Sequence, residues 1–227
     1  MKAQGRIKRI LGYLLILAMV IAMVPAMPSE AATAKSKAIA AYKKMLSKST
    51  VTVIPKKVRC GRFTRTRQPA KSKNVRFTIA YIDKDSVPEL ILLDSETEFC
   101  GIWTFRNGKV ENVDIINAAY KFLEGYSINV TGYYKKKGIY QVKSIFPGGY
   151  DKSFYKLSNG KVKDVLAARK DEAGTPEQYY SYGSNDTYKR LSQGVFKKKL
   201  KSYVGSTKMT KIVLRKNTAS NRKKYLK

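Results

Sequence analysis

Two Asn-Gly pairs, each placed between segments that alternate apolar and polar residues, constrain the fold of this chain more than any other feature. The pairs are Asn107-Gly108, between residues 99–105 and 109–113, and Asn159-Gly160, between residues 153–157 and 161–166. Both central residues of a type I′ turn need positive φ, which Asn and Gly tolerate, so each pattern predicts a tight antiparallel hairpin. The two units share Asn-Gly-Lys-Val, and they are either a duplicated meander or two hairpins with the same turn chemistry.

Two more hairpins follow from alternating segments joined by polar turns. They comprise residues 75–81 and 89–93 around the loop 83–88, and residues 127–134 and 139–146 around Lys135-Lys136-Lys137-Gly138. With the strand-like segments 50–54 and 58–67, these hairpins predict one mainly antiparallel sheet of about seven or eight strands. Trp103 alternates with Phe105 on one of them, so we expect Trp103 in the core.

Apolar residues at helical spacing predict a helix over residues 34–48 that packs on the sheet. The C-terminal part predicts a helix, a strand and a second helix. Ser192 is placed to cap the first helix and Gly205 to end it. The strand is expected over residues 209–215, and a short basic helix over residues 218–226.

Two other segments complete the predicted organisation. A helical turn is expected over residues 116–123, and the polar residues 171–190, which contain Gly and Pro, predict a loop or linker. The predicted fold class is therefore α+β, with an N-terminal helix, a mainly antiparallel sheet of hairpins and a C-terminal helix-strand-helix. We expect a single domain over residues 35–227.

Residues 1–34 are typical of a secretory signal peptide. Four basic residues precede an apolar run of 15 residues from Ile10 to Val24: Lys2, Arg6, Lys8 and Arg9. Small residues allow cleavage after Ala26, Ala31 or Ala34, of which we favour the later two. The run is shorter than the roughly 20 residues that span a bilayer, which disfavours the alternative of an uncleaved anchor. We expect a secreted protein with no transmembrane anchor after cleavage, soluble or held non-covalently at the cell wall.

Cys60 and Cys100 are the two cysteines of the chain. An exported protein with two cysteines predicts a Cys60–Cys100 disulfide, worth roughly 4 kcal/mol through loop closure. The alternative is two buried free thiols. The chain has no histidine, which excludes His-dependent catalytic triads and His-ligated zinc sites.

Basic residues dominate the charge: 46 Lys and Arg stand against 16 Asp and Glu, a formal net charge of +30. Residues 55–76 hold nine basic and no acidic residues, and residues 189–227 hold fourteen and none. Such a field attracts polyanions and is screened by salt. Residues 77–188, which hold most of the hairpins, carry every acidic residue except Glu30.

The basic ends predict binding of an anionic cell-surface polymer or acidic glycan, without sequence-specific readout of nucleic acid. In particular, the odd-numbered residues from Arg59 to Arg67 share one face of an extended segment and form a basic stripe. The candidate residues are Lys56, Lys57, Arg59, Arg62, Arg65, Arg67, Arg76, Lys197, Lys198, Lys199, Lys201, Arg222, Lys223 and Lys224. The alternative is a generally cationic, solubilising surface.

Asp83, Asp85 and Glu89 are candidate metal ligands. Residues 81–89 resemble the calcium loops of EF-hand-like and FG-GAP-type repeats, in which Asp83 and Asp85 match the third and fifth positions and Glu89 the ninth. Tyr81 stands at the first ligand position and Ser86 at the glycine position, which departs from that pattern. The resemblance implies calcium as the one candidate cofactor, and an ordinary hairpin loop is the alternative.

Three motifs resemble those of uncharacterised exported proteins of Gram-positive anaerobes. They are Ala-Tyr-Lys-Lys at residues 41–44, Asp-x-Asp-x-x-Pro-Glu-Leu at residues 83–90 and Asn-Arg-Lys-Lys-Tyr-Leu at residues 221–226. This resemblance implies export and one intact domain, and no particular activity.

The predicted function is non-catalytic binding of anionic extracellular or cell-wall polymers. Two alternatives stay open. The 16 tyrosines indicate a secreted carbohydrate-binding module that stacks aromatic rings on sugars. The acidic residues Asp94, Glu96 and Glu98, which share one face if the segment is extended, indicate a carboxylate-dependent enzyme that acts on glycans.

Overall fold

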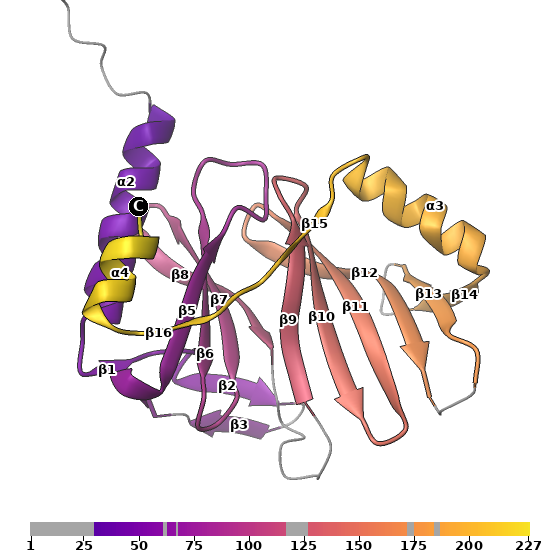
Figure 1. Cartoon of the computed structure of the whole chain (residues 1–227), viewed down its shortest axis with the longest axis horizontal. Coiled ribbons are helices and arrows are strands. Elements are labelled where there is room, and N and C mark those ends of the chain that lie inside the picture. Colours follow the sequence, from indigo (N-terminus) through magenta and orange to yellow (C-terminus); the bar gives the residue numbers. More distant parts are fainter. Residues whose placement is uncertain (1–29, 61–62, 67, 117–126, 172–174, 184–186) are drawn as a thin grey trace, which may run out of the picture. The chain divides into compact units, whose positions relative to one another are not determined.

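A five-stranded and a seven-stranded antiparallel sheet form most of the fold (Figure 1). The computed structural model describes residues 30–60, 63–66, 68–116, 127–171, 175–183 and 187–227, with the backbone alone for residues 30–32, 57–60, 63–66 and 127. Residues 34–227 form one compact unit. The predicted helical turn over residues 116–123 lies almost wholly outside the described residues.

The five-stranded sheet has the order β16-β5-β6-β7-β8. Its strands are β5 (Val75–Ala80), β6 (Glu89–Asp94), β7 (Cys100–Arg106), β8 (Lys109–Ile116) and β16 (Arg215–Lys216). The β5–β6 and β7–β8 hairpins confirm the sequence prediction. Asn107 and Gly108 have φ of 50° and 79°, as a type I′ turn requires.

The seven-stranded sheet has the order β14-β13-β12-β11-β10-β9-β15. Its strands are β9 (Ser127–Tyr134), β10 (Ile139–Phe146), β11 (Gly149–Ser158), β12 (Lys161–Lys170), β13 (Gln178–Tyr182), β14 (Tyr188–Leu191) and β15 (Met209–Lys211). The β9–β10 and β11–β12 hairpins are as predicted. The loop predicted over residues 171–190 is wrong, because β13 and most of β14 lie in it and extend the sheet beyond β12.

The prediction of a single sheet is also wrong, because β9 pairs with β10 and β15 and not with β8. Residues of β6 and β7 are apolar on both faces, so each face needs a covering layer. Ile91 and Ile102 pack toward Tyr140 and Val142 of the second sheet. Thus the two sheets share one buried cluster instead of a common hydrogen-bonding ladder.

Two short ribbons flank the first sheet: β1 (Thr50–Val51) pairs with β4 (Ala70–Lys71), and β2 (Lys57–Cys60) with β3 (Phe63–Thr66). A 3-10 turn, η1 (Ser72–Asn74), precedes β5. The β2–β3 register pairs Arg59 with Thr64 and Arg65 with Val58. The segment therefore turns back on itself, and the single extended basic stripe predicted from Arg59 to Arg67 is wrong.

Three α-helices lie among the described residues: α2 (Glu30–Leu46), α3 (Gln193–Val204) and α4 (Ala219–Tyr225). The Ser192 hydroxyl caps α3 by accepting from the Val195 N–H, and Gly205 follows the helix with φ of 61°. Thr218 caps α4 in the same way. These helices and the intervening β15 and β16 confirm the predicted C-terminal helix-strand-helix. No helix in the described part of the chain is long and apolar enough to cross a membrane.

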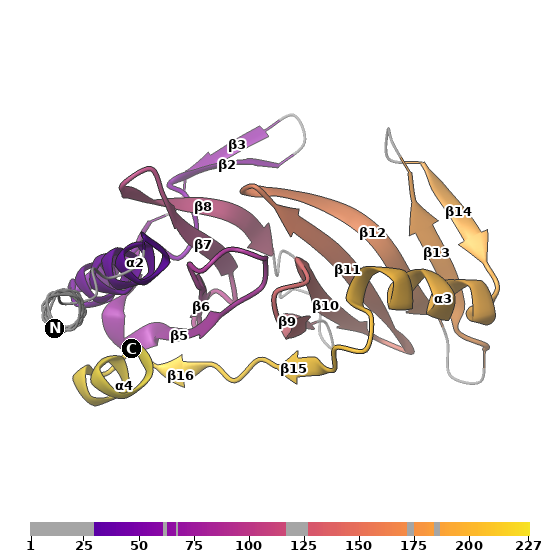
Figure 2. The ribbon, with the colours of Figure 1, turned by 90° about the horizontal axis from the view of Figure 1, so that it is seen from above.

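The helices cover the outer faces of the two sheets, as Figure 2 shows for α2 and α3. On the first sheet, Tyr42 and Leu46 of α2 pack with Phe77 and Trp103. Trp103 is buried and its Nε1 donates to the Val53 carbonyl oxygen at 2.8 Å, which confirms its expected place in the core. On the second sheet, Phe196 of α3 occupies a third cluster. The fold is α+β.

The C-terminal segment joins both sheets, because β15 pairs with β9 and β16 pairs with β5 (Figure 1). Beyond it, the buried Asn217 side chain donates to the Leu46 carbonyl oxygen at 2.8 Å and to Ser72 Oγ at 2.9 Å. Arg222 donates to Asn217 Oδ1 at 2.8 Å. These contacts fix α4 against the end of α2.

Candidate functional site

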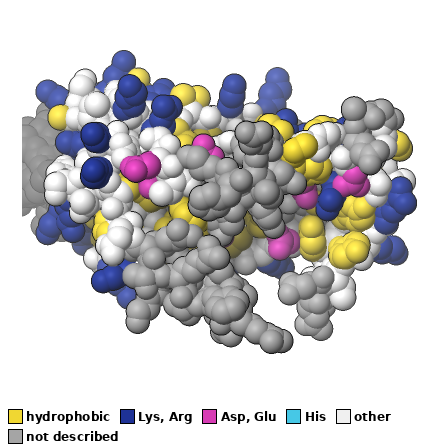
Figure 3. Space-filling view, turned by 90° about the horizontal axis from the view of Figure 1, so that it is seen from below, with side chains coloured by type: hydrophobic (Ala, Val, Ile, Leu, Met, Phe, Trp, Pro, Cys, Tyr) yellow, Lys and Arg dark blue, Asp and Glu magenta, His cyan; other side chains and the backbone are white. Residues whose placement is uncertain are grey.

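On the face that Figure 3 shows, lysine and arginine side chains lie mainly toward the edges, and a few acidic side chains lie between them. The lysines of α3 predicted to bind polyanions are all exposed: Lys197, Lys198, Lys199 and Lys201. Lys223 and Lys224 of α4 are exposed as well, as are Lys56 and Arg76. The structure thus places eight of the predicted basic residues at the surface, in several separate regions of the fold.

The other predicted basic residues do not join this surface as one set. Arg222 is half-buried and donates to Asn217 and to the Leu46 carbonyl oxygen, so it serves the fold. The side chains of Lys57, Arg59 and Arg65 are not described, and the other two predicted residues, Arg62 and Arg67, lie outside the described residues.

A cavity of about 490 Å³ lies where the loop between β5 and β6 meets the β7–β8 and β11–β12 hairpins. Asp83, Asp85 and Glu89 line it, together with Thr104 and Leu157. Its basic lining residues are Lys84, Arg106, Lys137 and Lys156. Sequence reasoning found the carboxylates from their spacing, but it missed these basic residues, because they come from four different segments.

The loop that carries the carboxylates is anchored from two sides. The Tyr42 hydroxyl of α2 donates to the Pro88 carbonyl oxygen at 2.8 Å. From the β9–β10 turn, the Lys136 and Gly138 N–H groups donate to the carbonyl oxygens of Tyr81 and Ile82, at 2.8 and 2.7 Å. The loop is therefore held in one conformation by elements far from it in the sequence.

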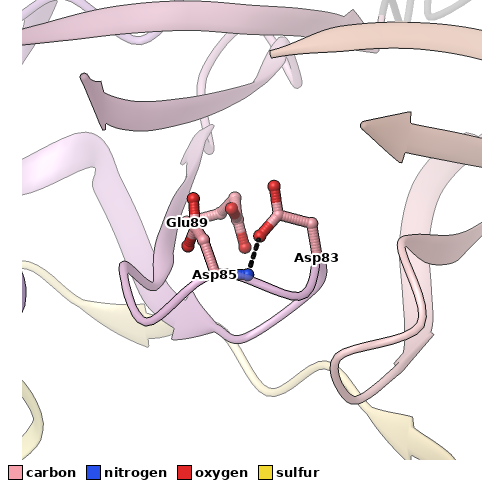
Figure 4. Close-up of side chains that lie close together, drawn as sticks. All are labelled: Asp83, Asp85 and Glu89. Atoms are coloured by element: carbon pink, nitrogen blue, oxygen red, sulfur yellow. Dashed lines mark hydrogen bonds between the residues drawn. The ribbon is translucent and has the colours of Figure 1, made fainter. Parts of the chain in front are cut away.

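The three carboxyl groups converge, as Figure 4 shows. Asp83 Oδ1 accepts from the Asp85 N–H at 3.0 Å, and Asp85 Oδ1 accepts from the Val87 N–H at 2.8 Å. Glu89 Oε2 accepts from the Ile82 N–H at 2.8 Å. One oxygen from each of the three carboxyl groups lies within 4.8 Å of the others. The structure therefore brings the predicted metal ligands together.

Glu89 is the unusual member of this group. Its side chain is 0% exposed, and its Oε1 has no hydrogen-bond partner. Burial, together with repulsion from Asp83, raises the pKa of Glu89 to about 8, and burial raises the pKa of Asp83 to about 6. A buried carboxylate with one oxygen unpaired is costly. Chemically, the cavity can hold a cation, or Glu89 can stay protonated.

A second, smaller cavity of about 290 Å³ lies on the seven-stranded sheet. Tyr180, Tyr182 and Tyr188 line it, with Asp151 and the Arg169–Asp171 ion pair. Tyr188 is 71% exposed, which is high for a large aromatic side chain. The number of tyrosines predicted a tyrosine-rich surface. It did not locate that surface, because the residues of β13 and most of β14 were predicted to form a loop.

The predicted carboxylate set Asp94, Glu96 and Glu98 does not form a catalytic pair on an extended face. Asp94 ends β6, and the other two residues lie between β6 and β7, where Asp94 accepts from the Glu96 N–H and from the Thr97 hydroxyl. Glu98 has φ of 59° and its N–H donates to the Asp94 carbonyl oxygen. These residues therefore form a turn. The expectation of an extended segment with three carboxylates on one face is wrong.

Cys100 is a buried free thiol on β7, in the cluster between the sheets. Cys60 belongs to the separate β2–β3 ribbon. The predicted disulfide is therefore not formed at Cys100, because tertiary packing places its side chain in the core between two sheets.

Comparison of the chain with protein-family models, with curated proteins and with solved structures finds no match.

Proposed function

We propose that this chain is an exported, non-catalytic protein that binds anionic polymers of the cell wall or extracellular surface through exposed lysines. The strongest support for this proposal is the excess of basic residues in the C-terminal region and their exposure on α3. Residues 189–227 contain fourteen basic and no acidic residues, and the lysines of α3 point to solvent while Phe196 and Val204 are buried. The cationic face is thus fixed in place by the apolar face of the same helix.

Helix α3 concentrates charge because Lys197, Lys198, Lys199 and Lys201 lie within little more than one turn. Like charges at this spacing repel each other, so they cost stability in the free protein. An anionic polymer that neutralises them relieves this repulsion and releases its own counterions, which makes the binding strongly dependent on salt. The N-terminal segment supports export to the place where such polymers occur.

The test is co-sedimentation of the protein with Gram-positive cell walls, with and without teichoic acid, across a salt series from about 0.05 to 0.5 M. One variant replaces the four α3 lysines by Gln. A matched control replaces four exposed lysines elsewhere by Gln: Lys43, Lys44, Lys161 and Lys163.

We expect teichoic-acid-dependent binding that weakens with salt and is lost in the α3 variant but largely retained in the control. The salt slope should fall by roughly one for each lysine that contacts a phosphate. An equal loss of binding in both variants would show that binding depends on the total charge and not on the α3 surface. Absence of binding to either wall preparation would refute the proposal.

The tyrosine-lined cavity favours a second candidate function, binding of a carbohydrate. Tyr180 and Tyr188 have ring centroids 5.7 Å apart, and the exposed Tyr188 ring offers an apolar face next to the polar groups of Asp151 and Arg169. Sugars bind where an aromatic face adjoins hydrogen-bonding groups. Binding to neutral glycans that resists high salt and is lost in Tyr188→Ala would favour this function over the first.

A further inference from the structure

The Glu89 carboxyl group is buried with only one of its two oxygens hydrogen-bonded. Its Oε2 accepts a backbone hydrogen bond, but Oε1 is buried and has no partner, and the residue lines the 490 Å³ cavity. Leaving a buried acceptor unpaired costs about 1 to 3 kcal/mol, and more for a charged group. An oxygen oriented in this way indicates a ligand that the protein itself does not supply.

The absence of an ion pair to the carboxyl groups of this cavity, within the described part of the chain, is unexpected in so basic a protein. The protein has 46 Lys and Arg residues. Nevertheless, among the described side chains, none forms an ion pair with Asp83, Asp85 or Glu89, although Lys109, Lys152 and Arg169 each pair with an acid elsewhere. The same cavity is also lined by basic residues: Lys84, Arg106, Lys137 and Lys156. None of them forms an ion pair with the three carboxyl groups.

We propose that Asp83, Asp85 and Glu89 bind a divalent cation in this cavity, with calcium as the preferred ion. Two oxygens bound to one calcium ion lie at most about 5 Å apart, since each bond is about 2.3 to 2.6 Å long. The three carboxyl oxygens, all within 4.8 Å of one another, meet this condition.

The site differs from a loop that provides every ligand itself. Tyr81 stands where a calcium loop would have its first carboxylate, so the loop contributes three acidic side chains. Calcium takes six to eight oxygens, and the rest come from water or from a ligand in the cavity, which Thr104 also lines. Magnesium fits less well, because it demands regular octahedral geometry and keeps its water.

The loop between β5 and β6 is already ordered without the ion, since Tyr42, Lys136 and Gly138 hold it by hydrogen bonds. A preorganised loop loses little conformational entropy on binding. With three carboxylates and an open side, we expect a dissociation constant of about 10⁻⁴ to 10⁻³ M, the range of extracellular calcium modules.

The experiment is calorimetric titration of the metal-free protein with CaCl₂ and MgCl₂ at pH 7.5, together with thermal unfolding in each ion. It uses no polymer, so its outcome is independent of the proposed function. The variants are Glu89→Gln and Asp85→Asn. Asp85 is exposed, so its variant folds even if the buried substitution does not. Glu111→Gln, at a surface ion pair, is the matched control.

We expect one calcium per chain, a melting temperature that rises with calcium, and weaker binding of magnesium. Asp85→Asn should weaken calcium binding at least tenfold, Glu89→Gln should abolish it, and Glu111→Gln should leave it unchanged. No heat and no thermal shift at about 10 mM calcium would overturn the proposal, because this concentration exceeds the expected dissociation constant. Unchanged calcium binding in Asp85→Asn or Glu89→Gln would overturn it equally.

Discussion

Replacing Glu89 by Gln removes a carboxyl group whose ionisation the fold strongly opposes. Gln keeps the size of the side chain and an oxygen that can accept from the Ile82 N–H. Burial, and secondarily Asp83, raises the pKa of Glu89 from its ordinary 4.5 to about 8 in the metal-free protein. The unfolded chain has the ordinary value, so the two states hold different numbers of protons between these pH values.

The sign follows from proton linkage. Between about pH 4.5 and 8 the folded protein keeps the Glu89 proton that the unfolded chain releases, so folding takes up a proton. The contribution of Glu89 to the free energy of unfolding is therefore fully present below about pH 4.5 and is lost as the pH rises toward 8. The difference between the pKa values is about 3.5 units, and at about 1.4 kcal/mol per unit the loss is on the order of 5 kcal/mol.

The assay is urea unfolding of the wild type and of Glu89→Gln in EDTA at pH 5, 7 and 8.5. We expect the wild type to lose most of this stability over the range and the variant to lose much less. Asp83, whose pKa is raised to about 6, contributes with the same sign in both proteins, so the difference between them reports Glu89 together with its repulsion of Asp83. Parallel pH profiles for the two proteins would refute the argument. Saturating calcium should also flatten the wild-type profile.

Two further predictions concern the fold. Asn217→Ala removes hydrogen bonds to the Leu46 carbonyl oxygen and Ser72 Oγ and takes away one of the two acceptors of Arg222, so urea unfolding should show a loss of about 2 to 3 kcal/mol. A loss below about 0.5 kcal/mol would contradict the role of Asn217 as the anchor of α4. Burial raises the pKa of the Cys100 thiol to about 12, so iodoacetamide at neutral pH should label Cys100 only after unfolding, as read by peptide mass spectrometry. Rapid labelling of Cys100 in the native protein, or a disulfide-linked Cys100 peptide, would contradict its burial as a free thiol.

Much of the candidate site was visible in the sequence, but its most informative property was not. The spacing of Asp83, Asp85 and Glu89 after an alternating segment was enough to group them. Their convergence depends on hydrogen bonds from Tyr42 and Gly138, which are distant in the sequence. The burial of Glu89 and its unpartnered oxygen result from packing around the cavity, and no local pattern reports packing between distant segments.

The sequence by itself determined the elements that depend on neighbouring residues. Asn107-Gly108 and Asn159-Gly160 set two hairpins, because their backbones accept positive φ at low cost. Ser192 and Thr218 began two helices, because a side-chain oxygen satisfies an N–H that the first turn leaves free.

Only the tertiary structure decided how these elements combine. The division into two sheets, the pairing of β15 with one and of β16 with the other, and the strands in residues 171–190 all depend on which distant edge each segment meets. A strand such as β14, with exposed polar residues, has no strong pattern of its own and forms because β13 offers it unpaired N–H and C=O groups. Local chemistry selects turns and caps, whereas strand pairing and burial are settled by contacts between residues far apart in the chain.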